Sequence, residues 1–191
     1  QYRTPQFLFD AELFHKAWEG TFDTYNRRQF LTLDSLAIPF AQTEGETVGL
    51  DAHARFNTQK FTGWVSYSYQ QSRTALGEGR SQTSNQDTPH NLKVVGQLAF
   101  GPWRVGSTWQ WVSGLPYSIP RIEQGLDPIT RELEYFLHLP ESRNTHRLPS
   151  THRLSLSLTY ALNTPVATGT IGVSIFNLYN QNLSLIHISE P

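Results

Sequence analysis

The sequence predicts an all-β fold, in the form of an antiparallel up-and-down transmembrane β-barrel of which this chain supplies an incomplete part. Three observations lead to this prediction. About seven stretches alternate polar and apolar residues with a period of two, which is typical of β-strands. One face of these stretches is apolar and carries aromatic residues near the strand ends, while the other face is polar. The connections between them alternate between long and short.

The composition excludes several other classes of protein. The chain has 191 residues and a net charge of −1, and its charged fraction of 16% is below the roughly 25% of soluble domains. Aromatic residues make up 13% of it. No cluster of Lys and Arg indicates nucleic-acid binding, and the absence of cysteine excludes a disulfide framework. No apolar run approaches the 18 residues that a transmembrane helix needs.

The clearest strand pair is a hairpin over residues 90–113, with a turn at Gly101 and Pro102. The apolar face of its two arms carries Leu92, Val94, Gly96, Leu98, Phe100, Trp103, Val105, Trp109 and Trp111. The opposite face includes Lys93, Gln97, Arg104 and Gln110. An apolar outer face with aromatic ends and a polar inner face is typical of a transmembrane barrel strand. Taken alone, the hairpin fits equally well a soluble sheet with one face on a core.

Five further strands show the same alternation, over residues 7–13, 47–57, 61–70, 153–162 and 171–175. Trp64 is an exception, since it falls on the polar face. Residues 18–45 are predicted to be mostly loop, with 21–30 extending or pairing a strand. Residues 75–89 are polar and without period, and are predicted to be a loop. Residues 114–150 contain five prolines and cannot form a central strand, so they are predicted to be a long loop, a length that usually indicates a function or a wrong assignment.

The order of the connections favours a membrane barrel over a soluble sandwich. Residues 57–60, 101–102 and 163–169 are short turns, and each long loop lies between two of them or precedes the first. Bacterial outer-membrane barrels have short periplasmic turns and long external loops. Aromatic residues near the short turns are Phe56, Phe61, Phe100, Trp103 and Tyr160, and those toward the long loops are Tyr69, Trp109 and Trp111. Because single-chain bacterial barrels have an even number of strands, seven strands predict a piece of a larger barrel.

Five stretches carry short motifs in a fixed order. They are residues 62–70 (TGWVSYSYQ), 86–95 (QDTPHNLKVV), 109–117 (WQWVSGLPY), 147–160 (RLPSTHRLSLSLTY) and 171–180 (IGVSIFNLYN). Together they resemble the C-terminal part of the β-barrel of TonB-dependent outer-membrane receptors. In that family a D-x-x-H-N element starts a strand, G-x-P starts a loop, a strand of the form R-L-P-x-x-x-R-L follows, and N-x-Y-N comes last. The resemblance covers nearly the whole chain up to Asn182.

This resemblance implies a plugged barrel of roughly 22 strands and the uptake of a scarce ligand with energy from TonB. The ligand would be a ferric siderophore, cobalamin, a glycan or a similar molecule. Residues 1–182 would form barrel wall and extracellular loops, with the plug and earlier strands before residue 1 and closing strands after residue 182. Residues 183–191 (LSLIHISEP) resemble a translated sequencing adapter, and we treat them as a non-native tail.

Two groups of residues are candidates for ligand binding. Asp51, His53 and Arg55 line one strand on the presumed lumen side, where the alternative is a solvated ladder of charges that satisfy one another. The loop of residues 114–150 is the other, because loops on a rigid scaffold commonly bind ligands; the alternative is a variable surface loop. Its candidate residues are Tyr117, Arg121, Arg131, Tyr135 and Arg143.

No motif indicates catalysis, a cofactor or a metal site. His138, His146 and His152 match no metal-ligand spacing, and there is no G-x-S-x-G or cysteine nucleophile. We therefore expect a transporter that is not an enzyme, located in the bacterial outer membrane. Its expected partners are the lipid bilayer, an extracellular ligand and the TonB complex through the plug. A passive porin or structural barrel is the alternative, followed by a soluble β-rich carbohydrate-binding domain.

Overall fold

The structure, a computed structural model, describes residues 1–24, 40–76, 80–119, 121–126, 133–138 and 143–181. These residues form strands, turns and irregular segments, and no helix occurs among them. The long strands of the main sheet are β2 (Phe7–Thr24), β3 (Phe40–Asn57), β4 (Phe61–Leu76), β6 (His90–Phe100), β7 (Trp103–Val112), β12 (Thr151–Asn163) and β13 (Thr168–Ile175). Two short strands complete it, β1 (Tyr2–Arg3) beside β2 and β5 (Arg80–Thr83) beside β4.

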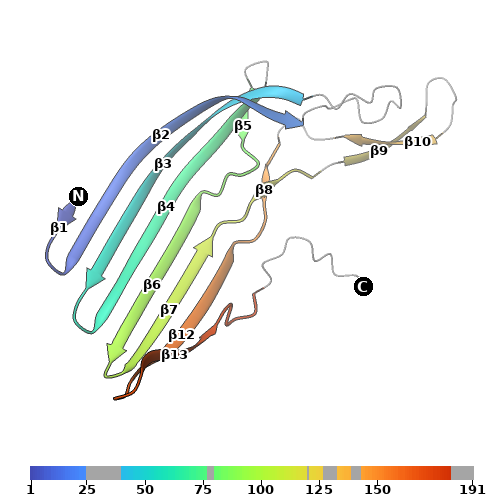
Figure 1. Cartoon of the computed structure of the whole chain (residues 1–191). Helices are drawn as coiled ribbons and strands as arrows, with labels where there is room; N and C mark the ends of the chain where they lie inside the picture. The colour runs from blue at the N-terminus through green and yellow to red at the C-terminus, as the bar shows by residue number, and fades with distance from the viewer. Residues whose placement is uncertain (25–39, 77–79, 120, 127–132, 139–142, 182–191) are drawn as a thin grey trace.

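The main sheet is antiparallel and up-and-down, with the long strands adjacent in the order β2-β3-β4-β6-β7-β12-β13. Figure 1 shows it as a single curved layer. The seven long strands contain the seven alternating stretches of the sequence, so the prediction of an all-β, antiparallel up-and-down sheet is confirmed. The two ends of the sheet do not meet in the described part of the chain.

The short turns lie together at one end of the sheet and the long connections at the other (Figure 1). The turn between β3 and β4 is closed by Thr58, whose backbone N–H donates to the Phe61 carbonyl at 2.7 Å. Thr164 closes the turn between β12 and β13 in the same way, toward Ala167 at 2.9 Å. Gly101, between β6 and β7, has a φ of +57°. Strands of a meander must reverse at alternate ends, and here every reversal at one end is tight.

Gly101→Ala is expected to destabilise the folded chain by roughly 1 kcal/mol, because a side chain is strained at positive φ. The site has open space around it, so backbone strain is the whole effect. Denaturant unfolding of the two proteins would measure the difference. An unchanged midpoint would show that this turn adopts another conformation.

Two predicted loops are partly strand, and there the prediction was wrong, except that the expected extension of a strand over residues 21–30 is confirmed for residues 21–24. Residues 18–24 and 40–45 continue the ladder of β2 and β3 as far as the pair Thr24 and Phe40. A bulge between Trp18 and Thr21 interrupts it, where Gly20 has a φ of +78°. Ala75 and Leu76 end β4, and β5 folds back on them. The apolar period is missing here because this part of the hairpins has no face to bury. The rest of the expected extension, residues 25–30, lies outside the described residues.

The segment of residues 114–150 is not a structureless loop, which corrects a second prediction. It contains two small antiparallel sheets, β8 (Pro116–Tyr117) with β11 (His146–Arg147) and β9 (Arg121–Leu126) with β10 (Leu133–His138). The second pair is a ribbon that projects beyond the sheet (Figure 1). Prolines exclude only central strands, and these strands are isolated two-stranded pairs in which Pro116 has a single neighbour, Arg147.

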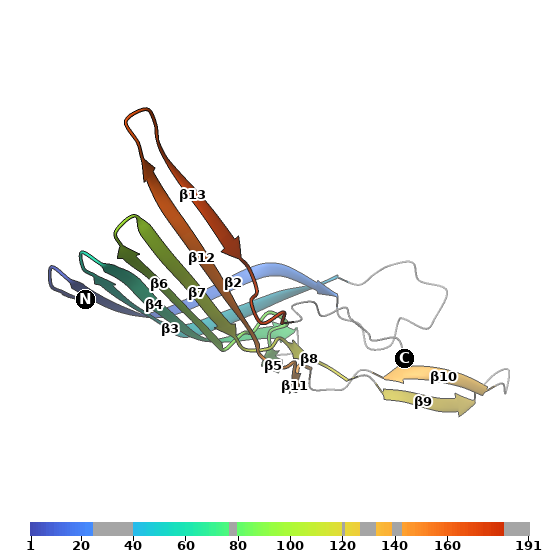
Figure 2. The same ribbon diagram turned by 90° about the horizontal axis from the view of Figure 1, so that it is seen from below.

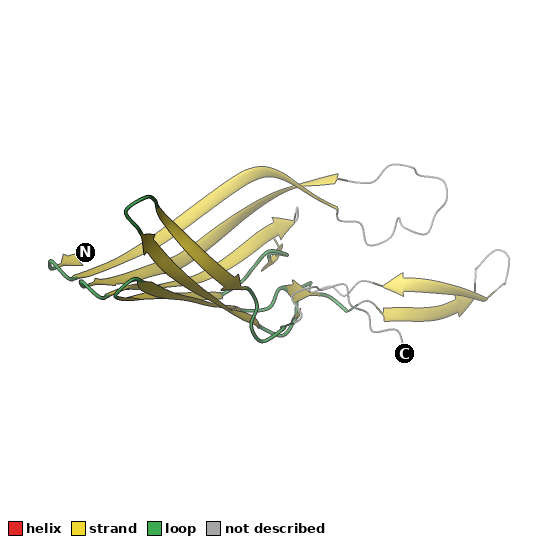
Figure 3. Ribbon diagram, turned by 60° about the horizontal axis from the view of Figure 1, so that its bottom comes forward, coloured by secondary structure: helices red, strands yellow, loops and turns green. Residues whose placement is uncertain are grey.

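The register assigns every side chain of the main sheet to one of two faces. Val94 pairs with Val65 and Trp109, so these apolar residues share a face. Lys93 pairs with Ser66 and Gln110 on the opposite face. The hollows of the sheet are lined mainly from this second, polar face, which is therefore the concave one. Figures 2 and 3 show the curvature of the sheet from two further directions. The apolar face of the hairpin formed by β6 and β7 is thus convex.

Successive hairpins are staggered by a regular amount. A line through paired residues, perpendicular to the strands, starts at Phe7, the first residue of β2, and reaches Ile175, the last of β13. Thr168, the turn end of β13, lies seven residues from that line after six strand spacings. With roughly 3.3 Å per residue and about 4.8 Å per spacing, the strands incline by about 40° from the direction perpendicular to the row of short turns.

Candidate functional site

The convex face carries a band of apolar side chains that no described residue covers. Leu98 is 47% exposed and Leu13 is 82% exposed. Further large apolar residues exposed on this face are Phe9, Val48, Val65, Val94, Val105, Leu158, Ile171, Val173 and Ile175. Soluble monomers rarely expose an apolar surface that runs across a whole sheet. The described part of the chain places no second layer on it (Figure 3).

Aromatic rings border this band on both sides. Near the short turns, the ring centroids of Phe56 and Phe61 are 6.1 Å apart and those of Trp103 and Tyr160 are 4.6 Å apart. Toward the long connections, the His90 ring lies between Tyr69 at 5.3 Å and Trp111 at 6.1 Å. Its Nδ1 is 2.8 Å from the Tyr67 hydroxyl. Further along the same border, the His152 and Tyr179 ring centroids are 5.5 Å apart.

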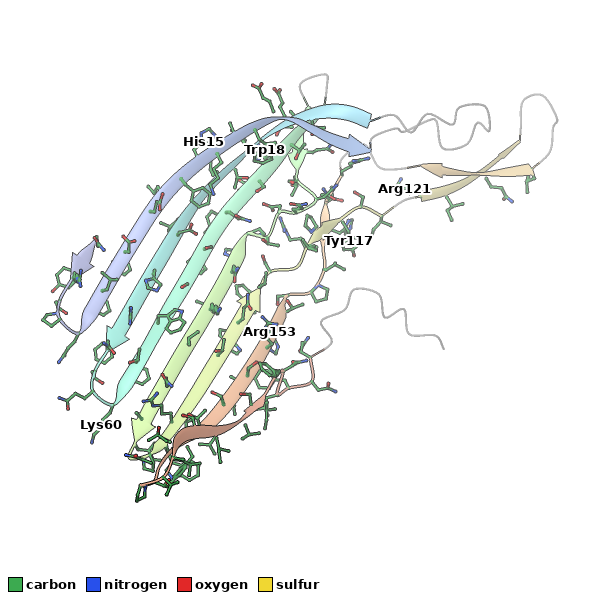
Figure 4. The ribbon with its side chains drawn as sticks, viewed as in Figure 1. His15, Trp18, Lys60, Tyr117, Arg121 and Arg153 are labelled. Atoms are coloured by element: carbon green, nitrogen blue, oxygen red, sulfur yellow. The ribbon has the colours of Figure 1, made fainter. Side chains whose placement is uncertain are left out.

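Beyond the second border the convex face becomes polar. The β2–β3 hairpin continues with His15, whose Nε2 lies 3.3 Å from the Glu46 carboxylate. Both side chains are more than half exposed, and Figure 4 shows His15 at this outer part of β2. On β4 the same face carries Gln71 and Arg73 after Tyr69. The convex face therefore has an apolar band with a polar zone above it.

On the concave face, β2, β3 and β4 enclose an open hollow of about 570 Å³ near the end of the sheet that carries the long connections. We call it the upper hollow. Two aromatic residues, Phe14 and Trp18, and one charged residue, Lys16, line it from β2. The remaining lining residues carry hydroxyl or amide groups. They are Thr43, Thr47, Gln70, Ser72, Thr74, Ser84, Asn85 and Gln86. The last three belong to the connection between β5 and β6, which turns back over the trough.

The two rings of the hollow lie over glycines of the neighbouring strand. Trp18 pairs with Gly45 and Phe14 pairs with Gly49. A Cβ at Gly45 would lie 2.6 Å from Trp18 Cε2, and a Cβ at Gly49 would lie 2.8 Å from Phe14 Cε1. Each ring therefore occupies the space of the missing side chain. Both rings are half-buried, because one side covers β3 and the other faces the hollow.

Asp87 anchors the wall of the hollow. Its side chain is 1% exposed, and its Oδ1 accepts a hydrogen bond from the Ser72 backbone N–H at 2.7 Å. Its Oδ2 pairs with the Arg147 guanidinium, which also donates to the Asp87 carbonyl at 2.8 Å and the Gly114 carbonyl at 3.2 Å. Leu148 approaches Gly114 so closely that no Cβ would fit there. This Asp87–Arg147 clasp joins the connection between β5 and β6 to both ends of the segment of residues 114–150.

Asn144 adds a second tie between the same connections. Its side-chain amide donates to the Thr83 carbonyl at 2.7 Å and to Asn85 Oδ1 at 2.8 Å, and its backbone N–H donates to Ser118 Oγ at 2.9 Å. Asn144 has a φ of +59°, a conformation that asparagine tolerates better than most residues. The edge of the hollow is thus held from both the β5–β6 and the β8–β11 connections.

The predicted lumen residues share the concave face of β3. Asp51 pairs with Glu12 and Ser68, and the Ser68 hydroxyl donates to its carboxylate. His53 pairs with Asp10, and Arg55 lies opposite Trp64. The strip therefore carries both acidic and basic groups, with Asp51 beside Glu12 and His53 beside Asp10. None of the three lines the upper hollow.

The predicted loop residues do not form one cluster with them. Tyr117 contacts His146 at 5.7 Å between ring centroids, and Arg121 starts the projecting ribbon (Figure 4). Arg143 is half-buried beside Asn144. Tyr135 belongs to β10, but the position of its side chain is not described, and Arg131 lies outside the described residues. The structure thus separates the ribbon from the concave strip of β3.

Sequence analysis missed the residues of the upper hollow. Phe14 and Trp18 fall on the polar side of the alternation, like Trp64, and each stands opposite a glycine of the next strand. Aromatic residues on a polar face are the signal that could have indicated them. Asp87 and Arg147 were noted only as parts of the resemblance motifs. Their 60-residue separation left no sign that they pair.

Among the described residues, no helix has the length and apolar character needed to span a bilayer. The same residues contain no group of three or more His, Cys, Asp or Glu side chains placed to hold a metal ion. No family model, curated protein or solved structure matches the chain.

Proposed function

We propose that the chain is part of the wall of an outer-membrane β-barrel that takes up a scarce ligand with energy from TonB. The observation that carries the membrane location is the convex apolar band between two aromatic borders, with no covering layer among the described residues. Lipid chains would cover it. Barrel strands tilt by roughly 35–45°, and the stagger of the hairpins corresponds to about 40°. Closure of the barrel would remove the sheet edges, which hydrocarbon does not tolerate.

The convergence of the resemblance motifs supports a receptor of the TonB-dependent type. Asp87 comes from the D-x-x-H-N element, Gly114 from G-x-P and Arg147 from R-L-P, and the three meet in one clasp. The motifs are therefore structurally related in this chain. In a receptor, the clasp would hold the external loops over the rim, where the ligand enters. The polar concave face would line the lumen.

Fractionation of cells that produce the whole protein tests the membrane location. We expect it in the outer membrane, released by detergent and not by high salt, because lipid contact through the apolar band is insensitive to ionic screening. Recovery in the aqueous fraction would overturn the proposal in favour of a soluble β-rich domain.

Uptake in cells separates active transport from passage through a porin. We expect accumulation of the ligand to stop when the proton gradient is collapsed or TonB is deleted. Uptake that continues at the same rate in both cases would identify a passive barrel. A plug domain with a TonB-box-like segment upstream of this chain would agree with the first result.

A further inference from the structure

We propose that the upper hollow of the concave face binds an oligosaccharide, and that Lys16 favours one that carries carboxylate groups. The inference rests on the proposed function, because it names the class of ligand that the inner wall would meet from outside. The hollow is lined by three strands of the sheet and by the β5–β6 connection.

The two rings give the hollow a sugar-stacking surface. Trp18 and Phe14 fill the space over Gly45 and Gly49 and line the hollow, and the Lys16 ammonium lies over the Phe14 ring, 4.8 Å from its centroid. Pyranose rings present faces of C–H groups, which pack on aromatic faces through apolar contact and through the ring quadrupole. Two such rings on one strand face, side by side with Lys16, form a platform for a ligand that lies along β2.

The spacing of the rings indicates an elongated ligand. Phe14 and Trp18 are four residues apart on one strand, which corresponds to roughly 13–14 Å. A single small planar molecule would reach only one of them. A chain of sugar units can contact both rings, and Lys16 stands between Phe14 and Trp18 along the strand. Figure 4 shows the position of Trp18.

The polar lining provides hydroxyl and amide groups in place of charged pairs. The Thr47 and Ser72 hydroxyls are buried and lie 2.7 Å apart, and the Gln70 amide donates to Thr88 Oγ1 at 3.3 Å. Asn85 and Gln86 reach the hollow from the β5–β6 connection. Such groups hydrogen-bond sugar hydroxyls. The clasp at Asp87 fixes this side of the hollow through the Ser72 backbone, so the binding surface is largely preformed.

Lys16 sets the preferred charge of the ligand. It is the one charged side chain among the described residues that line the hollow, and its Nζ lies 4.8 Å from the Phe14 ring centroid. No carboxylate lines the hollow in the described part of the chain. A ligand that carries carboxylates would therefore gain an attraction that its neutral form lacks, while a cationic ligand would be repelled.

Calorimetric titration of the whole protein in detergent micelles, with a galacturonate hexamer and its methyl ester as probes, tests the inference. The two probes share one sugar chain and differ in charge. We expect both to bind, and the acid to bind about threefold more tightly, as an exposed charge pair would produce. Lys16→Gln should remove the preference for the acid, so that the two affinities become equal.

Variants of the platform test the stacking. Trp18→Ala is expected to weaken binding of both probes about tenfold, whereas Trp103→Ala, on the convex face, should leave it unchanged. Gly45→Ala should weaken binding by displacing the Trp18 ring, and its Cβ would also lie 2.7 Å from the Arg73 carbonyl oxygen. Gly96→Ala is its matched control, since a Cβ there meets Phe61 only at an ordinary 3.5 Å. Circular dichroism identifies variants that do not fold, and Lys16→Gln tests the hollow without removing a packed ring.

Three outcomes would overturn the inference: no binding of either probe, affinities that do not depend on Trp18, or equal affinity for acid and ester in the unmodified chain. A ferric catecholate complex that binds in a Trp18-dependent manner while the sugars do not would assign the hollow to that ligand instead. Fractionation keeps this test separate from the proposed function. A chain in the outer membrane without sugar binding contradicts only the inference, and a chain in the aqueous fraction contradicts the membrane proposal.

Discussion

Val94→Arg is expected to destabilise the chain in lipid vesicles by about 2–4 kcal/mol, the effect of a cation on the lipid face of a barrel near mid-depth. The side chain of Val94 is on the convex face between the two aromatic borders and is already 37% exposed. In water, a substitution at so exposed a site usually changes stability by less than about 0.5 kcal/mol. A large effect therefore requires that hydrocarbon covers this face.

The neighbouring residue provides a matched control. Val95 is on the same strand but faces a second open hollow of the concave side, which Trp64 and Gln97 also line. An arginine at this position can reach water. We expect Val95→Arg to change stability by less than about 1 kcal/mol. Denaturant unfolding from vesicles, followed by tryptophan fluorescence, compares the two. Equal effects, or a larger effect at Val95, would mean that the convex face does not contact lipid.

Asp87→Ala is expected to destabilise the folded chain by roughly 2–3 kcal/mol and to loosen the connections that the clasp joins. The substitution removes a buried acceptor from the Ser72 N–H and leaves the Arg147 guanidinium without its carboxylate. The side chain of Arg147 is 36% exposed, so water compensates part of its charge. The effect should for that reason be smaller than the loss of a fully buried ion pair.

Two measurements check this prediction. The denaturant midpoint should fall, and limited proteolysis should cut residues 143–150 faster, because that segment loses its anchor. Asp87→Asn keeps an acceptor for the Ser72 N–H, so its denaturant midpoint should lie between those of the unmodified chain and of Asp87→Ala. Asp51→Ala is the control, since Asp51 is an exposed carboxylate bonded to Ser68. If Asp51→Ala and Asp87→Ala have equal effects, the clasp does not stabilise the fold.

The strands were predictable wherever one face is apolar. That Val94, Val65 and Trp109 lie on the apolar face follows from the alternation that each strand shows by itself. The prediction failed above the aromatic border, where β2 extends to Thr24 and β5 folds back on β4. Both faces of these segments are polar or mixed, so backbone pairing continues without an apolar period. The same reason hid the ribbon of β9 and β10.

The upper hollow was not predictable, because its parts come from distant segments. Nothing local in β2 shows that the Trp18 ring lies over a glycine 27 positions later, at Gly45, since this depends on the register of β2 and β3. The bulge between Trp18 and Thr21 alters that register just beyond the pair. In the same way, Asp87 and Arg147 meet only after two hairpins and the ribbon have been placed.

By itself the sequence determined which side chains share a face, which connections are tight, and that an apolar band bordered by aromatic residues runs across the strands. These properties are local, because a β-strand alternates its side chains at every residue. Only the tertiary structure decided how the hairpins are staggered, which residues line the hollow, and how one buried carboxylate joins two long connections. Register and loop return depend on pairings between residues far apart in the chain, and no local period encodes them.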